Sequence, residues 1–143
     1  MRFLSYTKDS KWCWGVREGG KIIDLSARLG SQYPTLQDAV AAGALTRLAD
    51  VARGLPADHD ESEITHEIPL SRPEKILCVG VNFPDRNAEY KDGQEAPPNP
   101  SLFVRFPRSF TGHGQPLIRP PESQQLDYEG EIAIVIGRAG RRI

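Results

Sequence analysis

Two glutamates near the C-terminal end of the sequence, Glu129 and Glu131, are separated by one glycine and precede the apolar run 132–136. If this stretch is a β-strand, side chains alternate between its two faces, so both carboxylates point to the same side. Two like charges side by side repel, and a hard divalent cation such as Mg²⁺ or Mn²⁺ relieves that repulsion by binding both. The alternative is a solvated strand edge with two surface glutamates, because so short a motif is not specific.

The composition is typical of an ordinary soluble globular protein of single-domain length. The 143 residues are 38% hydrophobic and 26% charged, with a formal net charge of -1. With no excess of basic residues, the charge balance does not indicate nucleic-acid binding. The longest apolar run is too short to cross a bilayer, and the start of the chain lacks the apolar core of a signal peptide. We therefore predict a cytoplasmic protein that binds neither nucleic acid nor membrane.

The first seventy residues have the pattern of a small α+β domain. Three short strand-like runs separated by turn-forming residues indicate a β-meander: 2–6, 12–17 and 21–25. Thr35 then has the pattern of a helix N-cap, with Asp38 at the capping-box position. Helical spacing continues from Leu45 until the sequence GLP at 54–56 stops it.

Residues 57–67 are polar and acid-rich, and we interpret them as a solvated linker. His59 and His66 lie among five acidic side chains, which could suggest a metal cluster, but no ligand spacing recurs. We therefore place the N-terminal domain and its linker at 1–70 and a second domain at 71–143.

The second half of the chain has the pattern of buried strands joined by loops. Residues 75–81 (KILCVGV) have the composition of a buried strand, and 102–106 (LFVRF) form the next strand candidate. The proline-rich stretch 96–100 indicates an extended connector, and the sequence TGHG at 111–114 indicates a turn. Loops that leave such strands commonly carry function.

Four sequence blocks, in this order, resemble the fumarylacetoacetate hydrolase family: ILCVGVNF at 76–83, SLFVRF at 101–106, GHGQPLIRP at 112–120, and DYEGE with VIGR within 127–138. The resemblance covers residues 75–143. It implies a mixed α+β, β-rich protein whose catalytic domain is a mixed β-sandwich roll, incomplete in this chain and preceded by a small α+β N-terminal domain. Members of the family are usually dimeric, so a homodimer is expected.

The resemblance also implies a reaction. In the family, Mg²⁺ or Mn²⁺ polarises a 2-oxo acid or 1,3-dicarbonyl substrate, and Glu129 and Glu131 would be two of its three carboxylate ligands. Such a metal acts as a Lewis acid on the enolate that develops when a carbon-carbon bond beside a carbonyl breaks. We therefore predict a hydrolase that cleaves an acylpyruvate or a related acid of aromatic catabolism.

The sequence departs from the family pattern on the lid that follows the strand at 75–81. Where the family has a His, this chain has Arg86, with Glu89 at the usual Glu position and Phe83 in place of the commoner Tyr. An arginine stays protonated near neutral pH and cannot act as a general base. Either Glu89 acts alone, or Arg86 holds a substrate carboxylate, which favours an isomerase, hydratase or decarboxylase of a 2-oxo dicarboxylate. An exposed i,i+3 ion pair between the two is the remaining alternative.

Arg105 and His113 are two further candidates for a role in function or assembly. Arg105 stands where the family often has a Lys, so it and Phe83 are assigned to substrate binding, with a strand-surface charge as the alternative for Arg105. His113 lies between two glycines, and we expect a structural or oligomer-contact role for it.

The third metal carboxylate of the family, an Asp, comes from sequence beyond residue 143, so this chain cannot complete the site. A strand at 132–136 would also leave an apolar edge unpaired. We expect a second polypeptide to supply the C-terminal half. A different interpretation is that the chain is a non-catalytic fragment or assembly domain that needs a partner chain.

Overall fold

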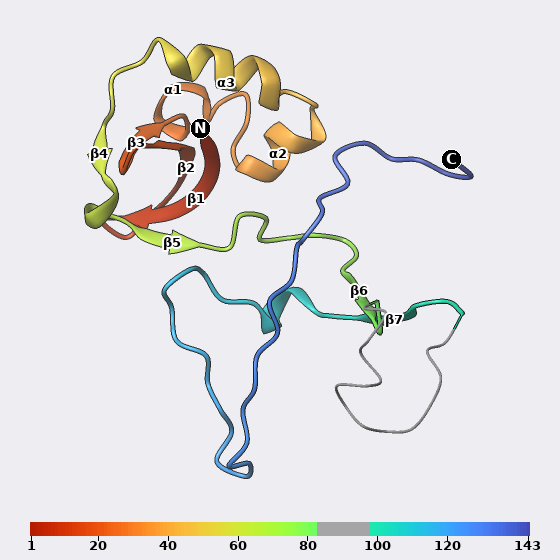
Figure 1. Cartoon of the computed structure of the whole chain (residues 1–143). Helices are drawn as coiled ribbons and strands as arrows, with labels where there is room; N and C mark the ends of the chain where they lie inside the picture. The colour runs from red at the N-terminus through yellow and green to blue at the C-terminus, as the bar shows by residue number, and fades with distance from the viewer. Residues whose placement is uncertain (83–97) are drawn as a thin grey trace. The chain divides into compact units, whose positions relative to one another are not determined.

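The computed structural model describes residues 1–82 and 98–143 (Figure 1). Its internal contacts divide the chain into two compact units. The first unit combines Met1–Ser71 with Thr111–Ile143, and the second is Arg72–Phe110. The first unit holds the buried core of the described residues.

A five-stranded sheet forms the centre of the first unit (Figure 1). Its strands are β1 (Arg2–Lys8), β2 (Lys11–Glu18), β3 (Lys21–Asp24), β4 (His59–Asp60) and β5 (Thr65–Glu67). Their order across the sheet is β4-β3-β2-β1-β5, and all neighbours are antiparallel. The meander expected over the first 25 residues is therefore confirmed as the three central strands.

Tight two-residue turns set the register of the meander. The turn from β1 to β2 has positive φ at Asp9 (48°) and Ser10 (62°), and the turn from β2 to β3 has it at Gly19 (57°) and Gly20 (77°). Positive φ at both central positions matches the twist of the flanking strands, which is why such turns dominate short hairpins. Glycine adopts this backbone conformation without steric cost.

Three helices follow the meander: α1 (Ser26–Leu29), α2 (Leu36–Ala41) and α3 (Leu45–Arg53). The capping box predicted at the start of α2 is confirmed. The backbone N–H of Asp38 donates to Thr35 Oγ1 at 3.2 Å, and the backbone N–H of Thr35 donates to Asp38 Oδ2 at 2.9 Å. The second predicted helix is confirmed as α3, which ends directly before Gly54.

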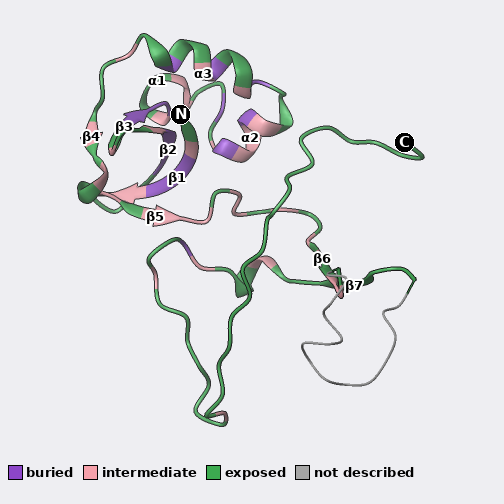
Figure 2. Cartoon of the chain, viewed as in Figure 1, coloured by how far each residue is buried: buried purple, intermediate pink, exposed green. Residues whose placement is uncertain are grey.

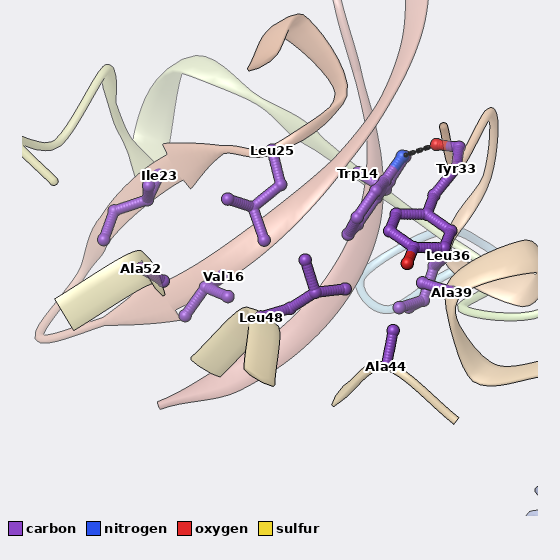
Figure 3. Packing of buried hydrophobic residues seen from close by; sticks show 10 residues of the cluster. All are labelled: Trp14, Val16, Ile23, Leu25, Tyr33, Leu36, Ala39, Ala44, Leu48 and Ala52. Atoms are coloured by element: carbon purple, nitrogen blue, oxygen red, sulfur yellow. Dashed lines mark hydrogen bonds between the residues drawn. The ribbon is translucent and has the colours of Figure 1, made fainter. Parts of the chain in front are cut away.

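Side chains on the two faces of the sheet pack into separate clusters, as the alternation along each strand requires. The larger cluster joins the sheet to the helices through these buried residues: Trp14, Val16, Ile23, Leu25, Tyr33, Leu36, Ala39, Ala44, Leu48 and Ala52 (Figure 3). The smaller cluster comprises Leu4, Tyr6, Cys13 and Ile22. The buried Trp14 Nε1 donates to the carbonyl oxygen of Tyr33 at 2.9 Å, so the indole adds a hydrogen bond to its packing.

The interpretation of residues 57–67 as a solvated linker is wrong. This segment forms β4, a 3₁₀ turn (η1, Glu61–Glu63) and β5, which complete the sheet at its two edges. Its acidic residues pair with basic side chains of the meander and α1, namely Arg28 with Asp58, Lys21 with Asp60 and Arg17 with Glu61. Within the described ranges no group of His, Cys, Asp and Glu side chains is arranged to hold a metal ion.

The second unit contains a hairpin of β6 (Leu77–Gly80) and β7 (Ser101–Val104), followed by a 3₁₀ turn (η2, Pro107–Ser109). Both strands were predicted. The prediction that the first is buried is wrong, because Leu77 on β6 is 63% exposed; Leu102 on β7 is likewise 64% exposed. A strand buries its side chains only where another layer covers the sheet.

The strand expected at 132–136 is not formed. Among the described residues no strand pairs with this segment, and its apolar side chains lie in solvent, with Ile132 93% exposed and Ile134 83% exposed (Figure 2). Without a neighbouring strand the backbone has no ladder of hydrogen bonds to hold it. No helix in the described part of the chain is long and apolar enough to cross a membrane.

The larger cluster gives a direct test of the helix-on-sheet packing. Leu48 is fully buried in it, whereas Val51 on the same helix is 43% exposed. We expect Leu48→Ala to lower the free energy of unfolding by about 2–5 kcal/mol, because it leaves a cavity in the core. Val51→Ala should change it by less than about 0.5 kcal/mol. Urea unfolding followed by circular dichroism measures both, and an equal loss in the two variants would contradict this packing.

Asp58 gives a second test, through pH. Arg28 donates two hydrogen bonds to its carboxylate at 2.6 and 2.9 Å, and the backbone N–H of Asp24 donates a third at 2.7 Å. The Arg28 guanidinium, followed by the backbone N–H, lowers the pKa of Asp58 below its usual value. A carboxyl whose pKa is lower in the folded state stabilises the fold above its unfolded pKa, and this contribution is lost as pH falls through the folded pKa.

We therefore expect Asp58→Asn to cost about 1–2 kcal/mol at pH 7, the range for a charge-assisted bond in partial contact with solvent. The difference from the unchanged protein should shrink below about pH 4, where aspartates protonate. Asp50, which pairs with Arg53 at the surface of α3, is the matched control. Asp50→Asn should cost less than about 0.5 kcal/mol. Urea unfolding between pH 3 and pH 7 checks this, and a difference that does not vary with pH would refute it.

Candidate functional site

Glu129 and Glu131 lie in the extended stretch after residue 120, and both are exposed. The backbone N–H of Tyr128 donates to Asp127 Oδ1 at 2.8 Å, which shapes the chain just before the pair. The stretch belongs to no strand in the described residues. The pairing of the Glu129 and Glu131 carboxylates therefore rests on their spacing in the sequence, and their role as metal ligands stays a prediction.

As a donor set, the two carboxylates suit the cation that was predicted. Carboxylate oxygens are hard ligands, which Mg²⁺ and Mn²⁺ prefer. Both side chains are open to solvent, so a cation can reach them. Two carboxylates leave a Mg²⁺-type site incomplete, because such ions take six oxygen ligands, of which the protein and the substrate supply a part.

Arg105 directly follows β7 in the second unit. Its guanidinium carbon lies 5.1 Å from the centre of the Phe103 ring, within the range of a cation–π contact. Its backbone N–H donates to the carbonyl oxygen of Ile76 at 3.3 Å, which extends the β6–β7 pairing by one bond. Arg105 is exposed, so this geometry agrees with the alternative of a strand-surface charge, and its substrate role stays a prediction.

The other predicted site residues, Phe83, Arg86 and Glu89, lie outside the described residues. The assignment of Arg86 and Glu89 to the lid, and of Phe83 to substrate binding, rests on the sequence.

His113 lies in the turn predicted at 111–114, which is confirmed and is closed by a hydrogen bond from the Gln115 backbone N–H to the Gly112 carbonyl at 3.1 Å. The His113 ring meets the His66 ring edge-on, with 5.3 Å between centroids. This contact agrees with the structural role expected for His113. Sequence reasoning missed Gln115, whose side chain reaches the backbone of β5; no local pattern marks a glutamine for a contact 49 positions away.

Asp24 and Tyr6 form a buried polar group on the smaller cluster. Burial raises the pKa of the Tyr6 hydroxyl well above its usual value, and the neighbouring Asp24 carboxylate acts in the same direction. Asp24 Oδ1 accepts hydrogen bonds from Ser26 Oγ at 2.6 Å and from the Ala27 backbone N–H at 2.9 Å. The Asp24 carboxylate therefore accepts hydrogen bonds from donors in the first turn of α1, which is a structural role.

Comparison with known proteins identifies the second half of the chain. A family model described as "Fumarylacetoacetate (FAA) hydrolase C-terminal" matches residues 75–143. Residues 75–143 thus belong to the fumarylacetoacetate hydrolase family, as the four sequence blocks in this range predicted.

Two relatives illustrate the sequence similarity. "Oxaloacetate tautomerase FAHD2A, mitochondrial" from Bos taurus is 36% identical over 128 residues, which cover 87% of this chain and 40% of the relative. "Oxaloacetate tautomerase YisK" from Bacillus subtilis (strain 168) is 40% identical over 85 residues, which cover 57% of this chain and 28% of that relative. The chain thus spans 40% or less of the length of these relatives.

Two solved structures share the fold at 20% sequence identity. A putative HpcE protein from Mycobacterium smegmatis superimposes with a TM-score of 0.61 over 82% of this chain and 40% of that one. Maleylpyruvate hydrolase from Sphingobium sp. SYK-6, in complex with manganese(II) and pyruvate, superimposes with a TM-score of 0.60 over 85% of this chain and 43% of that one. The prediction of a mixed α+β, β-rich fold is confirmed, and the chain spans 40% and 43% of the lengths of these two structures.

Proposed function

We propose that this chain forms part of a metal-dependent enzyme that interconverts the enol and keto forms of a 2-oxo dicarboxylate of the oxaloacetate type. The observation that carries the proposal is the similarity to relatives named oxaloacetate tautomerases, at 36% identity for the Bos taurus protein and 40% for the Bacillus subtilis protein. The chain spans at most 40% of either, so the rest of the catalytic domain has to be present for activity.

The residues of this chain fit that reaction. Glu129 and Glu131 would hold Mg²⁺ or Mn²⁺, which when bound supplies Lewis-acid polarisation of the 2-oxo group. Tautomerisation moves a proton between carbon and oxygen without attack by water, so it does not need the lid His that this chain lacks. Glu89 would carry that proton, since a carboxylate within reach of the substrate can accept and return it.

Arg86 gives the substrate preference. A guanidinium binds a carboxylate through two parallel hydrogen bonds, which orients it as well as neutralising it. A 2-oxo dicarboxylate has a second carboxylate for Arg86, whereas a 2-oxo monocarboxylate has none. Arg105 and Phe83 would line the same substrate.

Hydrolysis of an acylpyruvate is the second candidate. The description of the matching family as a hydrolase and the presence of Glu89 favour it. The replacement of the lid His by Arg86 weighs against it, because activating water for attack requires a base. A non-catalytic assembly domain is the third candidate, and it predicts that no metal binds.

Location and assembly remain proposals. The Bos taurus and Homo sapiens relatives are named as mitochondrial proteins, whereas the Bacillus subtilis relative is not. A cytoplasmic location stays a prediction. A homodimer, and a second polypeptide that supplies the rest of the catalytic domain, stay predictions; the denatured intact mass of the purified protein tests the latter.

Metal binding tests the carboxylate pair. In the protein that includes the remaining catalytic-domain sequence, Glu129→Gln and Glu131→Gln should each weaken Mn²⁺ binding at least tenfold, because each removes a charged ligand. Glu122→Gln, at an exposed glutamate seven positions before the pair, is the matched control and should leave the affinity unchanged. Isothermal titration calorimetry with Mn²⁺ measures all three. Equal affinity in every variant would remove the pair from the metal site.

A substrate panel tests the reaction. We expect the same protein to speed the enol-to-keto conversion of oxaloacetate in the presence of Mn²⁺, followed by the loss of enol absorbance, and not to cleave an acylpyruvate. Arg86→Lys should lower kcat/KM for oxaloacetate at least tenfold, because a lysine does not form the bidentate pair. Cleavage of the acylpyruvate without tautomerase activity would establish the hydrolase instead.

A further inference from the structure

The outer edge of the N-terminal sheet is occupied by another part of the same chain. β5 is an edge strand, and edge strands present unpaired backbone groups that proteins usually cover. Here the turn Thr111–Gln115 lies against β5, within the first unit of the chain. The turn belongs to the range matched by the family model, whereas β5 precedes that range.

The Gln115 side chain makes the contact with both ends of its amide. Its Nε2 donates to the carbonyl oxygen of His66 at 2.8 Å and lies 3.5 Å from Glu67 Oε2. Its Oε1 accepts from the Thr111 hydroxyl at 3.1 Å and from the Gly112 backbone N–H at 3.4 Å. One amide therefore holds the turn closed and joins it to the strand edge.

Gly112 allows the backbones to approach. It is the buried residue of the turn, in a stretch that is otherwise mostly exposed (Figure 2). A Cβ at this position would lie 2.2 Å from the carbonyl oxygen of His66 and 3.0 Å from Gln115 Nε2. Such distances are far below van der Waals contact, so any larger residue would push the turn away from β5.

The surface that receives the turn is itself held in place by charge. His66 Nε2 lies 3.1 Å from Glu61 Oε1, and the same oxygen accepts a hydrogen bond from Arg17 Nε at 2.6 Å. Arg17 is on β2 in the centre of the sheet. The edge-on contact of His66 with His113 adds an aromatic pair to the docked turn.

We propose that the β5 edge is a docking surface for the turn at 111–115, and that Gln115 is a positioning residue that anchors the segment Thr111–Ile143 to the N-terminal sheet. Glu129 and Glu131 follow Gln115 by 14 and 16 positions on the same segment. The N-terminal domain would thus restrict where the carboxylate pair lies. This last step rests on the proposed function, whereas the docking itself does not.

Hydrogen exchange of the 143-residue chain tests the docking. Peptides that cover 110–116 should exchange at least tenfold more slowly than an unstructured peptide of the same sequence. Gln115→Ala and Gly112→Ala should each remove that protection while peptides from β1–β3 keep theirs. Gly54→Ala is the control for the glycine change, because the nearest atom to its added Cβ is 3.9 Å away. Gln125→Ala is the control for the glutamine change. An unprotected turn in the unchanged chain, or full protection in both turn variants, would overturn the docking.

Mn²⁺ titration of the protein with its remaining catalytic-domain sequence tests the positioning role. Gln115→Ala should weaken Mn²⁺ binding at least threefold with no change in the exchange of the N-terminal sheet, and Gln125→Ala should leave it unchanged. If the turn is docked in the unchanged protein and Gln115→Ala still binds Mn²⁺ with the same affinity, the positioning role is overturned. If Glu129→Gln does not affect Mn²⁺ binding, the proposed metal site is contradicted. The docking of the turn is tested by hydrogen exchange and does not depend on that outcome.

Discussion

A β-strand exists only where a neighbour satisfies its backbone hydrogen bonds, and this constraint governs the whole chain. β1 has such a neighbour along its full length, from Arg2 opposite Arg17 to Lys8 opposite Lys11, and the sheet built on that pair carries the helices and the buried core. The apolar segment 132–136 has the composition of a strand but no pairing partner among the described residues, so it remains extended and exposed. Composition makes a strand possible, and pairing makes it form.

Electrostatic complementarity completes the sheet at its edges. The acidic residues of 58–61 face basic side chains that precede them by 30 to 44 positions, as in the pairs of Arg28 with Asp58 and of Arg17 with Glu61. Each pair at a partly solvated surface contributes little alone. Together with the backbone pairing of β4 and β5, these contacts convert a charged segment into two strands. The same network fixes His66, against which the turn carrying Gln115 docks.

Membership of the fumarylacetoacetate hydrolase family gives the C-terminal glutamate pair a chemical context that its local geometry lacks. Glu129 and Glu131 are exposed carboxylates that belong to no strand in the described part of the chain, and they lie within the range that the family model matches. The reaction proposed here needs a metal, a proton carrier and a cation for the second carboxylate of the substrate. This chain contributes candidates for each: Glu129 and Glu131 for the metal, Glu89 for the proton and Arg86 for the carboxylate.

The sequence by itself determined the features that depend on near neighbours: the meander and the places of its turns, the capping box of Thr35 and Asp38, the end of α3 before Gly54, and the family to which residues 75–143 belong. These were predictable because turns, caps and motifs are formed by residues a few positions apart. Only the tertiary structure decided that 57–67 joins the sheet, that 132–136 pairs with no strand of the described residues, and that Gln115 contacts β5. Those outcomes depend on which distant segments meet, and neither composition nor periodicity encodes that meeting.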